Sequence, residues 1–308
     1  MPLFNFPRPS TRALIDEARQ TPGFGLFDLL HAYVYGRWTH LYIALGSGRH
    51  PLAHRLAPVI GLIGRLLVRS ASREGAVQFE DTYHGKVIPL AGARELVSVR
   101  ETINLGDLEQ VIPYARARDL VLNNPDHIIA LDCPCRLSKT DHCSPVDVCL
   151  VIGEPFASFL MEHQPDRARW ISPDEAETIL KAEDERGHVH HAFFKDAMLG
   201  RFYAICNCCS CCCAALQAHR QGTPMLASSG YRMQVDALLC KGCKKCVQVC
   251  TFDALTVNGK AVIDPQRCMG CGVCAAQCKF DALTLVRDPE KGEPLMVQTL
   301  ISEKMRLG

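Results

Sequence analysis

Hydrophobic residues recur at helical spacing in two segments near the N-terminus, residues 11–20 and 25–45. Residues 56–68 follow with the nearly continuous apolar run LAPVIGLIGRLLV, which also contains a proline and an arginine. A membrane-spanning helix needs about 20 apolar residues, so this run is too short. The pattern predicts a helical N-terminal segment over residues 1–76 and no transmembrane helix.

Basic residues surround that apolar run and leave two interpretations of it. They are Arg49, His50, His54, Arg55, Arg65, Arg69 and Arg73. The helices of this segment can cover the rest of the protein and shield it from water. Alternatively, residues 26–69 make a peripheral contact with a membrane surface or dock a partner protein.

A capping box predicts a further helix in the middle of the chain. Ser172 is followed by Pro173, which suits the first helical position, and by Glu175 three residues later. Gly187 is typical of the residue just after a helix end. We therefore expect a helix over residues 173–186, followed by a strand.

Three histidines, His188, His190 and His191, lie on the strand expected after this helix. Such residues can supply an imidazole ligand or a proton relay, or they can be packed or solvated side chains. The same two interpretations apply to His84 and His142. Of these two, His142 is the better candidate for a hydrogen-bond donor to a cluster ligand, because it adjoins a cysteine.

The C-terminal part contains an internal repeat with an offset of 28 residues, since Cys240 corresponds to Cys268. The pentapeptide FDALT occurs at residues 252–256 and again at 280–284. Repeats of this kind are two copies of one small unit. Each copy is expected to form a short strand, a cysteine-bearing loop, a helical turn that carries the fourth cysteine, and a returning strand. The returning strands are expected at residues 254–257 and 282–286.

The composition is that of an ordinary globular protein except for cysteine. The chain has 308 residues, 34 Lys or Arg against 33 Asp or Glu, and a formal charge of +1. This balance gives no support for a nucleic-acid partner. The 18 cysteines would suit a disulfide scaffold only in a short secreted chain, and the first residues lack the pattern of a signal peptide. We therefore expect a cytoplasmic protein whose thiolates bind zinc, copper(I) or iron-sulfur clusters.

All the cysteines lie in four groups, and each is a candidate cofactor ligand. The groups are Cys133, Cys135, Cys143 and Cys149; Cys206, Cys208, Cys209, Cys211, Cys212 and Cys213; Cys240, Cys243, Cys246 and Cys250; and Cys268, Cys271, Cys274 and Cys278. Neighbouring groups predict neighbouring metal sites.

The last two groups share the spacing C-x2-C-x2-C-x3-C, which over residues 231–287 resembles the bacterial-type ferredoxin with two 4Fe-4S clusters. Zinc is a poor alternative, because zinc sites favour cysteine pairs separated by a longer loop. In that family the fourth cysteine of each run binds the other cluster. The resemblance therefore implies Cys240, Cys243, Cys246 and Cys278 as the ligands of one cluster, and Cys268, Cys271, Cys274 and Cys250 as those of the other.

This ferredoxin-like region is positively charged. Residues 231–287 contain eight Lys or Arg against four Asp, a net charge of +4, so we expect a redox partner with an acidic docking surface. Lys241, Lys244 and Lys245, like Arg136 upstream, either balance cluster charge or are solvated. Family members have proline where this chain has Thr251 and Lys279, and we expect both changes to stabilise the reduced clusters.

The two upstream groups have no such regular spacing. The four thiolates between Cys133 and Cys149 can complete one 4Fe-4S site alone or lend a ligand to the next group. The six from Cys206 to Cys213 cannot all reach one cubane, because adjacent side chains point in different directions. At least one of them is expected to be surplus, as inert packing or as a reactive thiol. The count predicts one or two further 4Fe-4S clusters, and three or four in total.

The segments DCPCR, DHCSPVDVC and ICNCCSCCC, preceded by EQVIPYARARDLVL, are similar to larger multi-cluster iron-sulfur proteins of anaerobic prokaryotes. This resemblance covers residues 80–287 and implies that single electrons pass through several clusters to or from a redox partner. Two alternatives stay open: an iron-sulfur oxidoreductase with an open or unusual cluster site at Cys206–Cys213, and a cluster carrier. A bound nucleotide or flavin has no support, because no glycine-rich phosphate motif occurs.

Taken together, these patterns predict an α+β protein with four parts. They are a helical N-terminal segment over residues 1–76, a cysteine-rich iron-sulfur domain over 77–228, a dicluster ferredoxin domain over 229–287, and a tail over 288–308.

Overall fold

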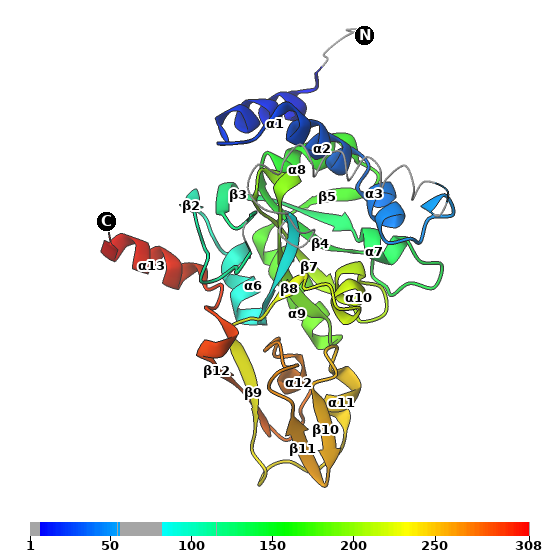
Figure 1. Cartoon of the computed structure of the whole chain (residues 1–308), viewed down its shortest axis with the longest axis vertical. Coiled ribbons are helices and arrows are strands. Elements are labelled where there is room, and N and C mark those ends of the chain that lie inside the picture. The colour runs from blue at the N-terminus through cyan, green and yellow to red at the C-terminus, as the bar shows by residue number, and fades with distance from the viewer. Residues whose placement is uncertain (1–6, 54, 56–81, 115, 308) are drawn as a thin grey trace.

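The computed structural model describes residues 7–53, 55, 82–114 and 116–307. Helices and strands both occur, and a large mixed sheet lies above a smaller C-terminal unit (Figure 1). The large sheet has eight strands: β1 Tyr83–Ile88, β2 Ile103–Leu105, β3 Leu120–Asp132, β4 Asp147–Glu154, β5 Ala168–Ile171, β6 Val189–Lys195, β7 Arg201–Cys208 and β8 Leu226–Ala227.

The strand order of this sheet is β2-β3-β4-β7-β6-β1-β8, with β5 paired to β3. Neighbouring strands are antiparallel except β1 and β8, which are parallel. In the pairing of β4 with β7, Cys149 lies opposite Cys206. The sheet therefore brings two upstream cysteine groups to neighbouring strands.

Each face of the sheet has its own hydrophobic core, because successive strand residues point to opposite sides. Ile129 and Leu131 of β3 belong to the first core, whereas Ile128 and Ala130 belong to the second. The first core is covered by α1 Pro9–Gln20, α2 Leu26–Arg37, α8 Phe156–His163 and α10 Ala214–Arg220. The second is covered by α6 Leu90–Val97, α9 Pro173–Glu185 and the start of α13 Val297–Leu307.

Local sequence signals placed several helices correctly. Helix α9 begins as its capping box predicts, with the Ser172 hydroxyl accepting a hydrogen bond from the Glu175 amide at 3.1 Å. The helical spacing of residues 25–45 corresponds to two helices, α2 and α3 Thr39–Gly46, which are separated at Trp38. The apolar run at residues 56–68 lies outside the described residues.

The C-terminal unit consists of two small antiparallel sheets and two helical turns. Strand β9 Tyr231–Val235 pairs with β12 Leu283–Arg287, and β10 Leu255–Asn258 pairs with β11 Lys260–Ile263. The helical turns are α11 Lys245–Val249 and α12 Val273–Ala276. The returning strands thus begin one residue later than predicted.

The prediction that each helical turn carries the fourth cysteine of its run is wrong. Helix α11 contains the third cysteine, Cys246, and ends before the fourth, Cys250. Helix α12 likewise contains Cys274 and ends before Cys278. Each fourth cysteine therefore lies just past the helical turn of its repeat. Among the helices that the structure describes, none is both long and apolar enough to cross a bilayer.

Candidate metal centres

The eight cysteines of the C-terminal unit form two sets that exchange their fourth members. Cys240, Cys243 and Cys246 line one small cavity together with Cys278 from the other repeat. The Ala261 amide donates a hydrogen bond to the Cys240 sulfur at 3.4 Å. Amide-to-sulfur bonds of this kind stabilise negative charge on metal-bound thiolates.

The second set consists of Cys268, Cys271, Cys274 and Cys250. Burial is the main cause that raises the pKa of Cys271 to about 12, and the nearby Cys250 and Cys268 thiolates raise it further. The Ala254 amide donates to the Cys250 sulfur at 3.3 Å. Burial raises the pKa of Cys274 as well, so the Cys271 and Cys274 thiols would be costly to ionise without a metal to compensate their charge.

Two glycines at repeat-related positions allow the cysteine loops to pack closely. Gly242 and Gly270 both have positive φ, 63° and 64°. A Cβ atom at Gly242 would collide with the Gly259 carbonyl, and one at Gly270 with the Tyr231 carbonyl. Glycine is therefore required in both loops for the backbone to fold tightly around each cysteine set.

Comparison with protein families agrees with this geometry. Residues 239–282 match the family described as 4Fe-4S dicluster domain. The C-terminal unit is a ferredoxin-like 4Fe-4S domain. All eight cysteines of this dicluster domain fall within the matched range, and the ten upstream cysteines lie outside it. A comparison with curated proteins gives no match to the chain.

The dicluster domain packs against the large sheet through its second cysteine set. Met269 and Val273, which flank Cys271, belong to the first core. Arg220 of α10 donates to the Thr251 carbonyl at 2.7 Å. The connection between β8 and β9 is also fixed, since Ser228 and Ser229 donate to the carbonyls of Met269 and Gly270 at 3.2 and 2.7 Å. The first set faces outward, where Cys243 is exposed.

The ten upstream cysteines divide into six and four, and this division does not follow their order in the chain. Eight of the ten line one cavity of about 710 Å³ on the first-core face of the sheet, and two of these eight, Cys209 and Cys212, also belong to a compact group with Cys143 and Cys211. We call the other six the chamber cysteines. They are Cys133, Cys135, Cys149, Cys206, Cys208 and Cys213.

Hydrogen bonds join the chamber cysteines to one another. Cys133 bonds to Cys135 and Cys149, and these bonds lower its pKa well below the ordinary value. The Cys213 and Cys208 sulfurs are 3.2 Å apart. Most of these thiols are buried, and burial raises the pKa of Cys208 despite its bond to Cys213. The sulfurs thus form a continuous buried lining that could hold a cluster.

The same chamber is also lined by aromatic hydroxyls and one cation. The Tyr35 and Tyr203 hydroxyls are 2.8 Å apart, and Tyr83 lies beside them. The Lys195 ammonium lies 4.8 Å from the ring centroids of both Tyr35 and Tyr83. Burial lowers the pKa of Lys195 to about 8. Sequence analysis missed all four residues, because they come from four separate elements and share no motif.

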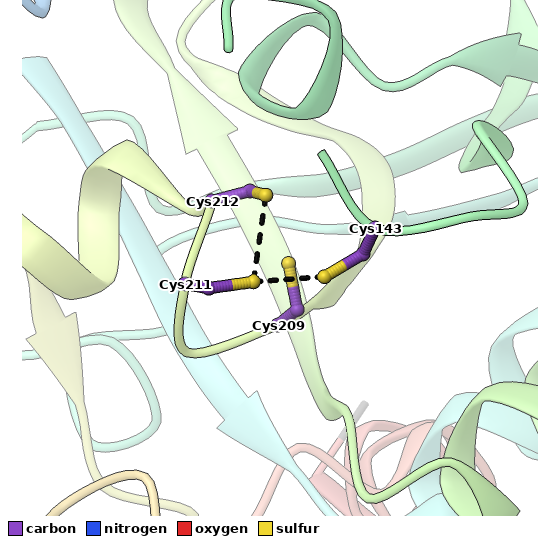
Figure 2. Close-up of side chains that lie close together, drawn as sticks. All are labelled: Cys143, Cys209, Cys211 and Cys212. Carbon is purple, nitrogen blue, oxygen red and sulfur yellow. Dashed lines mark hydrogen bonds between the residues drawn. The ribbon is translucent and has the colours of Figure 1, made fainter. Parts of the chain in front are cut away.

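The remaining four upstream cysteines form a compact group at the edge of the chamber, which we call the surface tetrad because its member Cys211 is exposed, whereas Cys209 and Cys212 are buried. They are Cys143, Cys209, Cys211 and Cys212, and their sulfurs all lie within 4.8 Å of one another (Figure 2). The Cys143 and Cys211 sulfurs are only 2.8 Å apart. Although Cys143 lies between chamber cysteines in the sequence, its loop carries it to the neighbouring site. The run from Cys206 to Cys213 is thus shared between two sites.

The upstream histidines are mostly held by ordinary packing contacts. His190 is buried and its Nδ1 lies 2.6 Å from Asn207 Oδ1. His188 Nδ1 lies 2.7 Å from Glu183 Oε2. His142 Nδ1 contacts the Cys143 carbonyl at 3.2 Å rather than its sulfur. These contacts favour the packing interpretation over direct metal ligation for the three residues.

The basic residues near the cysteines are of two kinds. Lys241, Lys244 and Lys245 are exposed around the outward cysteine set. Arg136 is fully buried, so the solvated interpretation is wrong for this residue. Its guanidinium bonds to Glu183 and to the carbonyls of Pro145 and Asn207, and so ties together the segments that carry the upstream cysteines.

Proposed function

We propose that this protein relays single electrons through three 4Fe-4S clusters, two in the dicluster domain and one in the chamber. The family match supports 4Fe-4S chemistry in the dicluster domain, where the two crossed cysteine sets would be the ligands. Four of the six chamber thiols would hold the third cluster. Bound clusters supply reversible one-electron chemistry, and the protein fixes their order and exposure. We place this relay in the cytoplasm, which keeps its many thiols reduced.

We propose that electrons enter or leave at the outward cysteine set. Phe280, which lines the same cavity as the exposed Cys243, is 40% exposed, so an apolar side chain is accessible at this set. Exposed lysines lie around the same cavity, including Lys244 and Lys245. An apolar centre with a basic rim fits a partner that has an acidic docking surface.

The gradient of exposure along the cysteine sets carries this proposal. Cys243 of the first set is exposed, whereas Cys274 of the second is buried and its neighbour Val273 packs into the first core. Beyond the second set, Phe252 meets His219 of α10 edge-on, with ring centroids 6.2 Å apart. Helix α10 also lines the chamber. The sets therefore form a path from the surface to the chamber.

The test is a count of metals and clusters followed by rapid kinetics. Anaerobically purified and reconstituted protein should contain about twelve irons with matching sulfide, by the four-iron content of each cluster. Cys243→Ser should slow reduction of the chamber cluster by a protein donor, while reduction by dithionite should change little. Eight irons or fewer, or an unchanged rate with the protein donor, would count against the relay.

A second candidate function is reduction of a small molecule in the chamber. The observation that favours it is that Tyr35, Tyr203 and Lys195 line the chamber together with the cysteines, which combines hydroxyl donors with a buried cation. A relay needs no such cavity, whereas a reductase needs space, proton donors and an attraction for its substrate.

Cyanide tests this second function because it binds a cluster iron that has no protein ligand. An open chamber cluster should change its EPR signal on addition of cyanide, and Tyr203→Phe should alter that change while leaving the dicluster signals intact. An unchanged signal favours the relay alone. Ready transfer of the clusters to an apo-acceptor would instead support a cluster carrier.

A further inference from the structure

We propose that the surface tetrad holds a single zinc ion rather than an iron-sulfur cluster. The first support is the spacing of its sulfurs. Among the described residues, this is the one group of three or more Cys, His, Asp or Glu whose ligand atoms all lie within 4.8 Å of one another. The eight cysteines of the dicluster domain form no such group in the part of the chain that the structure describes.

This contrast follows from the size of what each site encloses. A zinc ion binds thiolates at about 2.3 Å, so four tetrahedral sulfurs lie about 3.8 Å apart. A cubane places an iron corner between its centre and each thiolate, and its ligand sulfurs lie further apart. The dicluster domain serves as the internal comparison, because its sequence family specifies cubanes and its sulfurs are more widely spaced. The sulfurs of the tetrad lie closer together than those of the dicluster domain, as a single zinc ion requires.

The donor set is also that of a closed structural site. Four thiolates complete the tetrahedral coordination of zinc and leave no open position for a substrate. Figure 2 shows the four side chains converging on one point from two loops, the loop of Cys143 and the tight turn of residues 209–212. Soft thiolates in a tetrahedral arrangement select zinc or iron over harder ions.

Basic side chains surround the tetrad and fix its backbone. Arg49 donates to the Cys212 carbonyl at 2.7 Å, and Lys139 donates to the Cys211 carbonyl at 2.9 Å. Arg220 donates to the Ser210 carbonyl at 3.2 Å. Four thiolates and one Zn²⁺ leave a net charge of −2, and these cations compensate it. The turn is thus held in place from outside as well as by the proposed ion.

The position of the tetrad indicates what the ion would do. Cys209 and Cys212 also line the chamber, and they lie between Cys208 and Cys213 in the sequence. A zinc ion would pin this turn to the Cys143 loop and so hold two chamber cysteines at their places. Because zinc does not change oxidation state, it would also end the electron path at the chamber.

The experiment measures metals in the full-length protein after reconstitution with iron and sulfide. The wild type should retain about one zinc per chain, and zinc X-ray absorption should show four sulfurs at about 2.3 Å. Cys143→Ser and Cys211→Ser should each lower the zinc content at least tenfold, while the iron content and the EPR signals of the dicluster clusters stay unchanged. Ser210→Ala, in the same turn, is the matched control and should retain zinc.

Three outcomes would overturn the proposal. Loss of about four irons and one EPR signal in Cys143→Ser would show a cubane at the tetrad. A high-spin ferric signal that disappears in the same variant would show a single iron in place of zinc. A metal-free tetrad with a disulfide between Cys143 and Cys211 would show a thiol switch. Zinc content does not depend on electron transfer, so failure of the relay would leave this result standing.

Discussion

Arg136 and Glu183 form a fully buried ion pair, with 2.6 Å between the Arg136 Nη2 and Glu183 Oε2 atoms. Glu183 belongs to α9 in the second core, whereas Arg136 lies in the short helix α7 Pro134–Leu137 between two chamber cysteines and Cys143. Burial opposes the charge of Arg136, but the hydrogen bond and the attraction of Glu183 raise its pKa further above the ordinary value. The pair therefore links the cysteine-bearing loop to the helix on the other side of the sheet.

Arg136→Met is expected to destabilise the protein by about 3–5 kcal/mol, because it leaves the Glu183 carboxylate buried without its fully buried cationic partner. Anaerobic urea unfolding followed by circular dichroism measures the change. Arg186→Met is the matched control: Arg186 binds the same carboxylate at 3.0 Å but is 44% exposed, so its loss should cost about 0–1 kcal/mol. Equal effects of the two variants would contradict the argument.

Lys86→Met is expected to stabilise the protein at neutral pH. Lys86 is 1% exposed, and burial, with a smaller effect of Arg287, lowers its pKa to about 7 from the ordinary 10.5. Between these values the unfolded chain binds a proton that the folded protein releases, so the wild type gains stability as the pH rises from 7 to 10.5. Lys86→Met should raise the free energy of unfolding by about 3–4 kcal/mol at pH 6 and by less than half of that at pH 9.5.

Urea midpoints of the wild type and the variant at the two pH values measure this dependence. Lys181→Met, which removes an exposed lysine from α9, should show little change at either pH. A gain in Lys86→Met that is the same at pH 6 and pH 9.5 would show that improved apolar packing, and not the titration of the amine, is its cause.

Reduction of the dicluster domain by an acidic electron-carrier protein is expected to slow as the salt concentration rises. Lys244→Glu with Lys245→Glu should slow it severalfold at low salt, because these exposed cations adjoin the outward cysteine set. Stopped-flow absorbance measures the rate. The rate with dithionite should be nearly the same in variant and wild type. A rate with the protein donor that changes neither with salt nor with the substitutions would exclude this docking surface.

Single Cys→Ser changes at the six chamber positions are expected to be unequal. One 4Fe-4S cluster needs four thiolates, so at least two of the six variants should keep the chamber EPR signal. Anaerobic EPR of the six proteins measures this, with Cys211→Ser of the surface tetrad as the control that should keep all cluster signals. Loss of the chamber signal at all six positions would indicate a larger cluster that uses every thiol.

Local signals in the sequence predicted much of the fold and the cysteine chemistry. The capping box at Ser172 defined the start of α9, and the repeat of 28 residues defined the dicluster domain, because both depend on residues close together in the chain. The division of the upstream cysteines could not be predicted in the same way. Whether Cys143 joins Cys149 or Cys211 depends on the pairing of β4 with β7 and on the path of a loop.

The tyrosine and lysine lining of the chamber is the clearest case of a site without a sequence signal. Tyr35 comes from α2, Tyr83 from β1 and Tyr203 from β7, and Lys195 ends β6. Each of these residues is unremarkable in its own segment. Only the packing of α2 over the first-core face of the sheet brings them together beside the cysteines.

The bonds from Ser228 and Ser229 to the Met269 and Gly270 carbonyls have a consequence for how fast electrons can move within the molecule. Some redox proteins carry a cluster on a swinging arm, whose rate depends on diffusion of that arm through solvent. Here two of the three residues between β8 and β9 are bonded to the loop of the second cysteine set, so this connection is not free to swing. Internal electron transfer should therefore proceed at the same rate in viscous glycerol solution as in dilute buffer.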